Sequence, residues 1–263
     1  MEKNTTNIRY ENEILAWEYD QRNSDLGEGE LEWYLKYIRK VDGPVIEFAC
    51  GSGRILIPIA EKGHKIEGID KSKAMVNRLK EKSEVYNSKF RKNVELYCDD
   101  MVTFDYKKKY ELGFIGYNSI YYLRTKKKIK KFINIVFDLL ADNGYFLFMI
   151  RRQDLSRYKN NNKFIVDWLD EPIEDKKRNI SIGTKSIKNL DKEKKRIIAE
   201  STYVIKKENN EKIIETTTYE PVISKNQFKK MLEKVGFKVN IYGGYKEKEL
   251  KPEHKNICFV CRK

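Results

Sequence analysis

Residues 47–53 read Glu-Phe-Ala-Cys-Gly-Ser-Gly, and this short stretch decides the fold. It continues an apolar run that begins at Val45 and reads as a strand, and it precedes a segment of helical spacing from Arg54 to Lys62. Small residues in such a turn let the backbone approach a ligand, and the N–H groups at the helix start face its carboxylate or phosphate. The sequence therefore predicts a ligand-binding loop between a first strand and a first helix.

Acidic residues farther along the chain extend this site. Asp70 ends the next apolar run and lies 19 residues after Gly51, a spacing suited to a carboxylate that accepts hydrogen bonds from ribose hydroxyls. Asp100 and Met101 follow a third strand-like stretch. Because ligands of parallel sheets bind outside the carboxyl ends of the strands, these segments are expected to form one site.

The sequence of this loop does not match two common phosphate-binding motifs. A dinucleotide-binding loop requires a third glycine three positions after Gly53, where Leu56 stands. A P-loop requires Gly-Lys-Ser or Gly-Lys-Thr at its end, and the stretch lacks it. Both alternatives are excluded.

The order of the expected elements defines the fold class. Strands are expected at 45–49, 65–69, 94–98, 112–117 and 145–150, alternating with helices at 54–62, 72–83 and 129–140 and with a turn at 143–144. Three consecutive β-rich stretches follow at 179–188, 196–206 and 212–221, then a helix at 227–235 and strands at 238–242 and 256–261. This order predicts an α/β fold with a Rossmann-like, doubly wound, seven-stranded and mostly parallel sheet and an inserted antiparallel β-sheet.

We expect three parts along the chain. Residues 1–40 form an N-terminal helical lid, residues 41–155 and 222–263 form the Rossmann-like domain, and residues 156–221 form the antiparallel insertion that covers an acceptor site.

Composition narrows the function classes. The formal net charge is +14, but the lysines are spread along the chain, which is typical of a solvated surface and argues against a nucleic-acid partner. No run approaches the ~20 apolar residues of a membrane span, and we expect a cytoplasmic protein without a membrane partner. Cys258 and Cys261 would face opposite sides of a strand, and no second Cys or His pair completes a tetrahedral site, so no metal is expected.

The motifs together resemble class I S-adenosylmethionine-dependent methyltransferases. Residues 45–53 are similar to their first motif, residues 68–75 to their second, and residues 99–101 to the segment that brackets adenine, so the resemblance covers about residues 44–150. It implies S-adenosylmethionine as methyl donor and S-adenosylhomocysteine as product. The positions that it implies for donor binding are Glu47, Ala49, Gly51, Gly53, Asp70, Lys71, Met75, Asp100, Met101 and Tyr117.

The acceptor side resembles glycine N-methyltransferase-like enzymes, whose layout aminosugar N-methyltransferases largely share. Residues 117–123, Tyr-Asn-Ser-Ile-Tyr-Tyr-Leu, stand where nucleic-acid amino methyltransferases carry Asp/Asn-Pro-Pro-aromatic. The resemblance implies a small-molecule acceptor, most simply an amine, and a monomer or homo-oligomer. It implies an arginine for a substrate carboxylate at Arg151 and a lid aromatic at Tyr19. Asn118 is suited to orienting an amine or the donor's carboxylate, or to capping the next turn, and Tyr122 and Tyr245 are candidates for enclosing the acceptor.

Two other functions stay open at this point. One is an RNA or protein methyltransferase that uses the basic surface, for which residues 107–109 and 126–131 are the candidate contacts. The other is a non-catalytic S-adenosylmethionine-binding protein, because a fold and a binding site do not guarantee chemistry.

Overall fold

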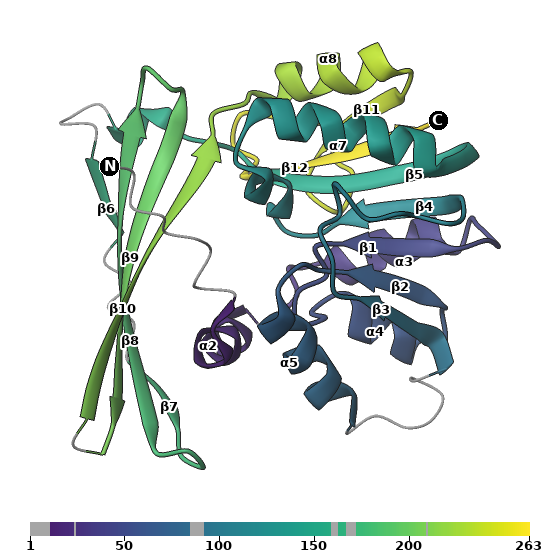
Figure 1. Cartoon of the computed structure of the whole chain (residues 1–263). Helices are drawn as coiled ribbons and strands as arrows, with labels where there is room; N and C mark the ends of the chain where they lie inside the picture. Colours follow the sequence, from purple (N-terminus) through teal and green to yellow (C-terminus); the bar gives the residue numbers. More distant parts are fainter. Residues whose placement is uncertain (1–10, 24, 85–91, 159–162, 167–171, 209) are drawn as a thin grey trace.

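A seven-stranded sheet forms the centre of the computed structural model, which describes residues 11–23, 25–84, 92–158, 163–166, 172–208 and 210–263 (Figure 1). The strand order is β11-β12-β5-β4-β1-β2-β3. The strands are β1 (Val45–Phe48), β2 (Ile66–Ile69), β3 (Val94–Tyr97), β4 (Tyr110–Ile115), β5 (Leu140–Arg151), β11 (Lys238–Gly243) and β12 (Asn256–Arg262).

The sheet is mostly parallel. Strands β1 to β5 pair in parallel, whereas β12 is antiparallel to both β5 and β11. The strand order reverses beside β1, because the chain goes from β1 to β2 and β3 on one side and returns to β4 on the other. Ligands of such sheets bind outside the carboxyl ends of the strands at this switch point, so a ligand is expected to contact the loops after β1 and β4. The Rossmann-like fold expected from the sequence is confirmed.

Helices cover both faces of this sheet. One core cluster joins α7 (Lys126–Leu139) and α8 (Lys225–Val235) to one face through Phe132, Phe228 and Phe259. The other cluster joins α3 (Glu30–Ile38), α4 (Leu56–Glu61) and α5 (Lys73–Glu84) to the opposite face, with Tyr34 and Phe114 fully buried in it. Cys261 lies in the first cluster and Cys258 in the second, so these two cysteines face opposite sides of β12 as predicted.

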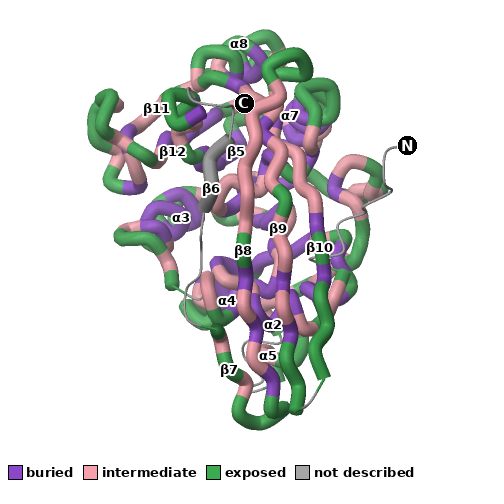
Figure 2. Tube along the Cα trace, turned by 90° about the vertical axis from the view of Figure 1, so that its left-hand side faces the viewer, coloured by how far each residue is buried: buried purple, intermediate pink, exposed green. Residues whose placement is uncertain are grey.

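A second, antiparallel sheet is inserted between β5 and α8, also as expected. Its long strands β8 (Ile180–Asp191), β9 (Arg196–Lys207) and β10 (Asn210–Pro221) pair along their whole lengths. Two short strands, β6 (Lys163–Val166) and β7 (Ile173–Asp175), pair with β8, and the sequence had given no sign of either. Figure 2 views this sheet face on, with α2 and α5 behind the lower halves of its strands.

Helix α2 (Glu13–Asn23) lies between the two sheets. Its residues Leu15 and Trp17 pack on Ile182 and Tyr203 of the second sheet, while Ala16 packs on α5. Helix α3, in contrast, is part of the core of the first sheet. We propose that α2 alone acts as the lid expected at residues 1–40; residues 1–10 of that range lie outside the described part of the chain.

Two boundaries differ from expectation for local reasons. Helix α7 begins three residues early because the Thr125 side chain accepts a hydrogen bond from the Lys128 N–H and caps the helix. The expected turn at residues 143–144 is instead a register shift within β5, with Asn143 at a left-handed φ of 65°.

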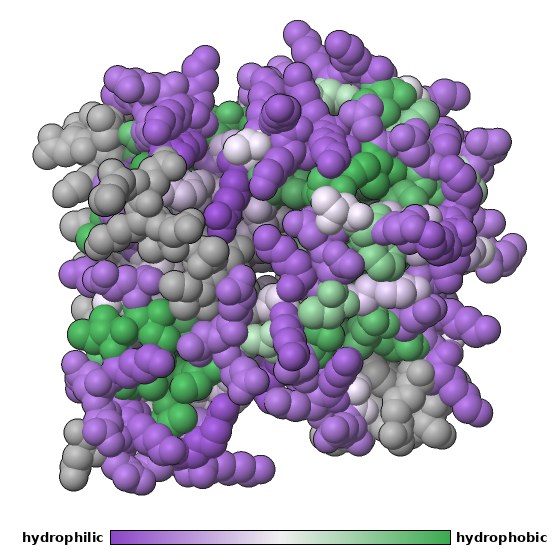
Figure 3. All heavy atoms as spheres, viewed as in Figure 1, coloured by the Kyte–Doolittle hydropathy of each residue, from purple (hydrophilic) through white to green (hydrophobic). Residues whose placement is uncertain are grey.

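The surface agrees with the composition. The face in Figure 3 is largely hydrophilic, in keeping with a chain in which 36% of residues are charged. Among the described helices, none combines the length and the apolar character that crossing a membrane demands.

Candidate functional site

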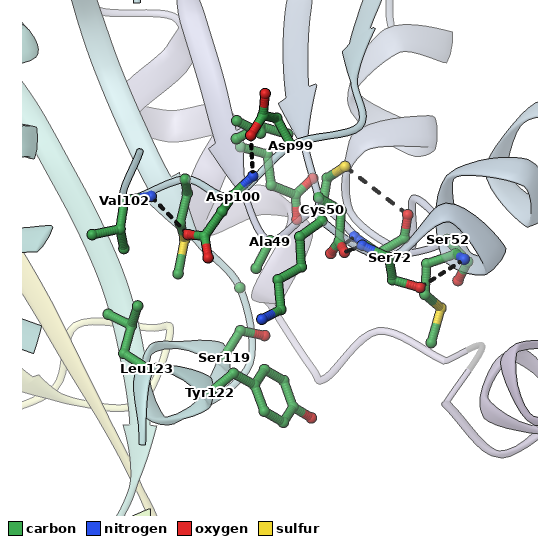
Figure 4. A pocket seen from close by; sticks show the side chains of 18 of the residues that line it. Ala49, Cys50, Ser52, Ser72, Asp99, Asp100, Val102, Ser119, Tyr122 and Leu123 are labelled. Carbon is green, nitrogen blue, oxygen red and sulfur yellow. Dashed lines mark hydrogen bonds between the residues drawn. The ribbon is translucent and has the colours of Figure 1, made fainter. Parts of the chain in front are cut away.

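A pocket of about 300 Å³ lies at the carboxyl ends of β1, β2 and β4. It gathers eleven of the fifteen residues expected at the site. These are Tyr19, Glu47, Ala49, Gly51, Asp70, Lys71, Met75, Asp100, Met101, Tyr117 and Tyr122. In Figure 4, Ser119, Tyr122 and Leu123 lie across this pocket from Asp99 and Asp100.

The loop after β1 has the tight backbone that its small residues predict. Gly51 has a left-handed φ of 55°, and a Cβ built on it would meet nothing within 4 Å, so its open side faces the pocket. Asp70 holds this loop in place, because its Oδ2 accepts a hydrogen bond from the Gly51 N–H at 2.9 Å. Its Oδ1 accepts a second bond from the Ser72 N–H at 2.8 Å. Burial raises the pKa of Asp70, and these two bonds oppose that shift.

Glu47 is a buried carboxyl group on the same wall of the pocket. It is 3% exposed, and its Oε2 accepts no hydrogen bond from the described residues. Burial raises the pKa of Glu47 well above its usual value; Arg54 opposes this rise, and the nearby charges of Glu30 and Asp70 add to it. A buried acceptor without a partner is costly, so this oxygen points to a cationic or hydrogen-bonding ligand in the pocket.

The loop after β3 forms a further wall. Asp100 accepts a hydrogen bond from the Val102 N–H at 2.9 Å, which fixes its carboxylate at the pocket edge (Figure 4). Met101 is 8% exposed and Met75 is 3% exposed, so both add apolar surface. An acidic edge beside apolar side chains suits a planar ring that carries an amino group.

The segment after β4 carries the residues expected on the acceptor side. Tyr117 and Asn118 both have left-handed φ angles, of 32° and 61°, and such strain is typical of functional loops. The Asn118 Oδ1 accepts a hydrogen bond from the Arg151 N–H at 2.8 Å, which ties the end of β4 to the end of β5. Neither residue lines the pocket, but the Arg151 guanidinium lies 5.6 Å from the centre of the Tyr117 ring, which does.

Two other expected residues lie outside the pocket. A Cβ on Gly53 would meet Leu79 at 2.9 Å and Ile57 at 3.0 Å, so this glycine allows close packing of α4 on α5. Tyr245 is 8% exposed and donates its hydroxyl hydrogen bond to Glu30 at 2.9 Å. The phenol of Tyr245 therefore supports another residue and does not enclose the pocket.

Arg54 lines the pocket and was missed in the sequence. Its guanidinium forms a two-pronged pair with Glu30, with N–O distances of 2.7 and 2.8 Å, and lies 5.3 Å from the centre of the Tyr117 ring. Burial lowers the pKa of Arg54, but the bonds to Glu30 outweigh that effect and raise it. The one local sequence feature that could have predicted Arg54 at the pocket is its position directly after Gly53. No sequence pattern near Glu30 predicts that it pairs with Arg54.

The pocket carries a basic edge and no metal cluster. Lys71, Lys128 and Lys131 line it together with Arg54. Within the described ranges, no group of three or more His, Cys, Asp or Glu side chains is arranged to hold a metal ion.

Comparisons with known proteins agree with this geometry. Residues 45–144 match the family model described as "Methyltransferase domain". The Bacillus subtilis protein YqeM, which carries the name of a methyltransferase, is 31% identical over 106 residues, or 40% of this chain and 41% of that protein. The chain spans about half the length of the curated relatives it matches.

Solved structures resemble nearly the whole chain. An S-adenosylmethionine-dependent methyltransferase from Clostridium acetobutylicum has a TM-score of 0.75 and 17% identity, covering 95% of this chain and 97% of that one. The sugar N-methyltransferase KedS8 from Streptoalloteichus has a TM-score of 0.71 and 14% identity, covering 96% and 94%. At such identities the likeness concerns the fold.

The matched segment contains β1 to β4 and the loops that build the pocket. Residues 45–144 therefore match a methyltransferase domain model, and the fold is that of the solved S-adenosylmethionine-dependent methyltransferase, in agreement with the motifs.

Proposed function

We propose that the protein is an S-adenosylmethionine-dependent methyltransferase that acts on a small-molecule amine. The observation that supports this most strongly is the pair of carboxyl groups beside the glycine loop. Asp70 fixes the loop, and Glu47 offers a buried oxygen that the described residues leave without a hydrogen bond. A ligand with ribose hydroxyls and an ammonium group would satisfy both.

The pocket residues fit this donor. Asp70 would accept from the ribose hydroxyls with the lone pairs that its backbone contacts leave free, and Glu47 would face the ammonium group. Asp100 would accept from the adenine amino group, between the apolar side chains of Met75 and Met101. When bound, S-adenosylmethionine supplies an electrophilic methyl group on a sulfonium.

The chain's own contribution to the reaction is mainly position. Methyl transfer needs a nucleophile held about 3–3.5 Å from the methyl carbon, and holding both partners supplies much of the rate enhancement. Tyr19, Tyr117 and Tyr122 would wall the acceptor and exclude water. An amine that arrives neutral requires no general base, in keeping with a chain that contains two histidines.

The acceptor class is inferred from structures of similar fold and from the charge at the pocket edge. Solved structures with the same fold include one named as an amino pentose methyltransferase and one named as a sugar N-methyltransferase, and their matches cover 94% and 96% of this chain. The basic edge at Lys71, Lys128 and Lys131 keeps RNA as the alternative acceptor, because lysines beside a pocket suit phosphates.

A labelled-donor screen tests the proposal. The purified protein would be incubated with methyl-labelled S-adenosylmethionine and separate pools of amino acids, aminosugars, other small amines and total RNA. Label in a small-amine pool supports the proposal, and label in RNA alone favours the alternative. Donor binding without transfer to any pool would indicate a non-catalytic donor-binding protein.

Arg151→Ala should raise the KM for the acceptor that this screen identifies by about tenfold, with little change in the KM for the donor. The expected cause is loss of a charge-assisted hydrogen bond to an anionic group of the acceptor. Steady-state kinetics with each substrate varied in turn provides the measurement. Arg157→Ala, which removes an exposed arginine paired with Asp154, is the control and should leave both constants unchanged. If both KM values rise equally, Arg151 does not bind an anionic group of the acceptor.

Donor binding should release a proton from Glu47 at pH values below the pKa of Glu47 in the free protein. Burial raises the pKa of Glu47 in the free protein, and a facing ammonium would favour the ionised form and lower it. Affinity should therefore increase with pH through the free-protein pKa of Glu47 and then level off. Calorimetry in buffers of different ionisation enthalpy measures the release.

Glu47→Gln should abolish this proton release. Glu67→Gln removes a different buried carboxyl group, which lies outside the pocket and bonds to Tyr110, and should leave the release intact. An undiminished release in Glu47→Gln would exclude Glu47 as its source.

A further inference from the structure

Asp20 of α2 is a buried carboxylate that joins three elements. It is 7% exposed and accepts hydrogen bonds from the Ser52 hydroxyl, from Arg78 Nε at 2.8 Å and from Lys82 Nζ at 3.0 Å. Ser52 belongs to the glycine loop, and the two cations belong to α5. Nothing in the pattern of α2 singled out this residue.

The glycine loop is thus held from two sides. Asp70 accepts from the Gly51 N–H, and Asp20 accepts from the side chain of the next residue, Ser52, which is 1% exposed. Both carboxylates form charge-assisted hydrogen bonds, which are roughly twice as strong as neutral ones. Asp70 comes from the sheet that carries the loop, whereas Asp20 comes from a helix that lies outside that sheet.

The residues before Asp20 connect the same helix to two other places. Tyr19 lines the pocket and packs against the cluster of Ala16, Ala74 and Met75. Glu18 is fully buried and accepts hydrogen bonds from Arg22 Nε at 2.6 Å and from the Thr184 hydroxyl of the second sheet at 3.3 Å. Three consecutive residues of α2 therefore contact the second sheet, the pocket and the glycine loop.

We propose that Asp20 is a positioning residue for donor binding. Its bond to Ser52 couples the position of α2 to the conformation of the glycine loop, which is expected to bind S-adenosylmethionine. Because Tyr19 lies on α2, the position of this pocket residue is coupled to the loop as well. The inference rests on the proposed function, because it concerns the donor. It assigns α2 a part in shaping the donor site as well as in covering it.

The test compares Ser52→Ala and Asp20→Asn by calorimetry with S-adenosylhomocysteine, which binds without turnover. Each variant should raise the dissociation constant by about fivefold, since Ser52→Ala removes the hydrogen bond to the carboxylate and Asp20→Asn removes the charge that strengthens it. The double variant should bind about as weakly as the weaker single variant, because both changes act on the same bond between Asp20 and Ser52. Glu81→Gln is the control: it removes the exposed ion pair of the same Arg78 without touching the loop, and should bind as the wild type does.

Further readouts separate positioning from a merely structural role. The midpoint of thermal unfolding of Ser52→Ala should stay close to that of the wild type while the KM for the donor rises and the KM for the acceptor does not. Tyr19→Ala combined with Asp20→Asn should show less than additive loss of affinity, because both act through α2.

Wild-type affinity in both Ser52→Ala and Asp20→Asn, with a wild type that binds, would overturn this inference and leave the proposed function intact. A folded wild type that binds neither S-adenosylmethionine nor its product would overturn the proposed function and this inference with it.

Discussion

Asp70→Ala is expected to raise the dissociation constant for S-adenosylmethionine by about 10- to 100-fold. This corresponds to a loss of roughly 1.5–3 kcal/mol of binding free energy, because charge-assisted hydrogen bonds are removed. The loss has two sources. The ribose hydroxyls lose their acceptor, and the Gly51 and Ser72 N–H groups lose theirs, so the loop that meets the donor relaxes as well.

Calorimetry with the donor and with S-adenosylhomocysteine measures the effect, alongside thermal unfolding. Asp70→Asn should bind better than Asp70→Ala, because an amide keeps one oxygen for one of the two N–H groups. Asp105→Ala removes an exposed acid that pairs with Lys107, and its affinity should equal that of the wild type. Affinity within about twofold of the wild type in Asp70→Ala would remove Asp70 from the donor site.

Local patterns explain why so much of the donor side could be predicted from the sequence. The glycine loop and Asp70 are each set by a few neighbouring residues and by the strand that precedes them. Once the alternation of strands and helices fixes a parallel sheet, the carboxyl ends of β1, β2 and β3 must meet at one edge. The spacing from Gly51 to Asp70 therefore translates directly into the observed hydrogen bond between them.

The acceptor side is less predictable because its contacts are distant in the chain. Tyr245 was expected at the pocket, yet its hydroxyl bonds to Glu30, which is 215 residues away in sequence. Arg54 was taken only as the start of a helix, although it lines the pocket and pairs with that same Glu30. Such partners depend on how α3 and the chain after β11 pack together, and no short sequence pattern reports that packing.

The predicted boundaries of two elements were wrong where the conformation or side chain of a single residue extends the element. The Thr125 cap lengthens α7, and the left-handed Asn143 lets β5 continue through the expected turn. The short strands β6 and β7 have too few residues to show an alternating pattern, so they appear only when β8 is present to pair with them.

Glu30→Gln is expected to destabilise the protein by about 3–5 kcal/mol, since breaking a buried ion pair leaves its partner charge uncompensated. Glu30 is 1% exposed and Arg54 only 10%, and Glu30 also accepts from the Gly27 N–H at 2.9 Å and from Tyr245. Urea unfolding at neutral pH, with the slope compared between variants, measures the loss. Tyr245→Phe removes one of these bonds and should cost no more than about 1.5–3 kcal/mol.

The dependence on pH gives this prediction a sign. Burial raises the pKa of Glu30, but the bonds from Arg54 outweigh it and hold the pKa below its usual value. A carboxyl group with a lowered pKa in the folded state contributes stability above its unfolded pKa and loses it as pH falls through the folded one. The difference between the wild type and Glu30→Gln should therefore be full at neutral pH and should narrow in acid.

Two matched variants decide whether the buried pair is the cause. Glu32→Ala lies on the same helix and removes an exposed pair with Arg39, where 61% and 56% of the two side chains are accessible, so it should cost less than about 1 kcal/mol. Glu30→Gln combined with Arg54→Met should be more stable than the sum of the two single losses, because no charge is then left buried alone. Strictly additive losses would mean that Glu30 and Arg54 stabilise the fold independently. The ion pair would then not be what holds Arg54 beside Tyr117 in the pocket wall.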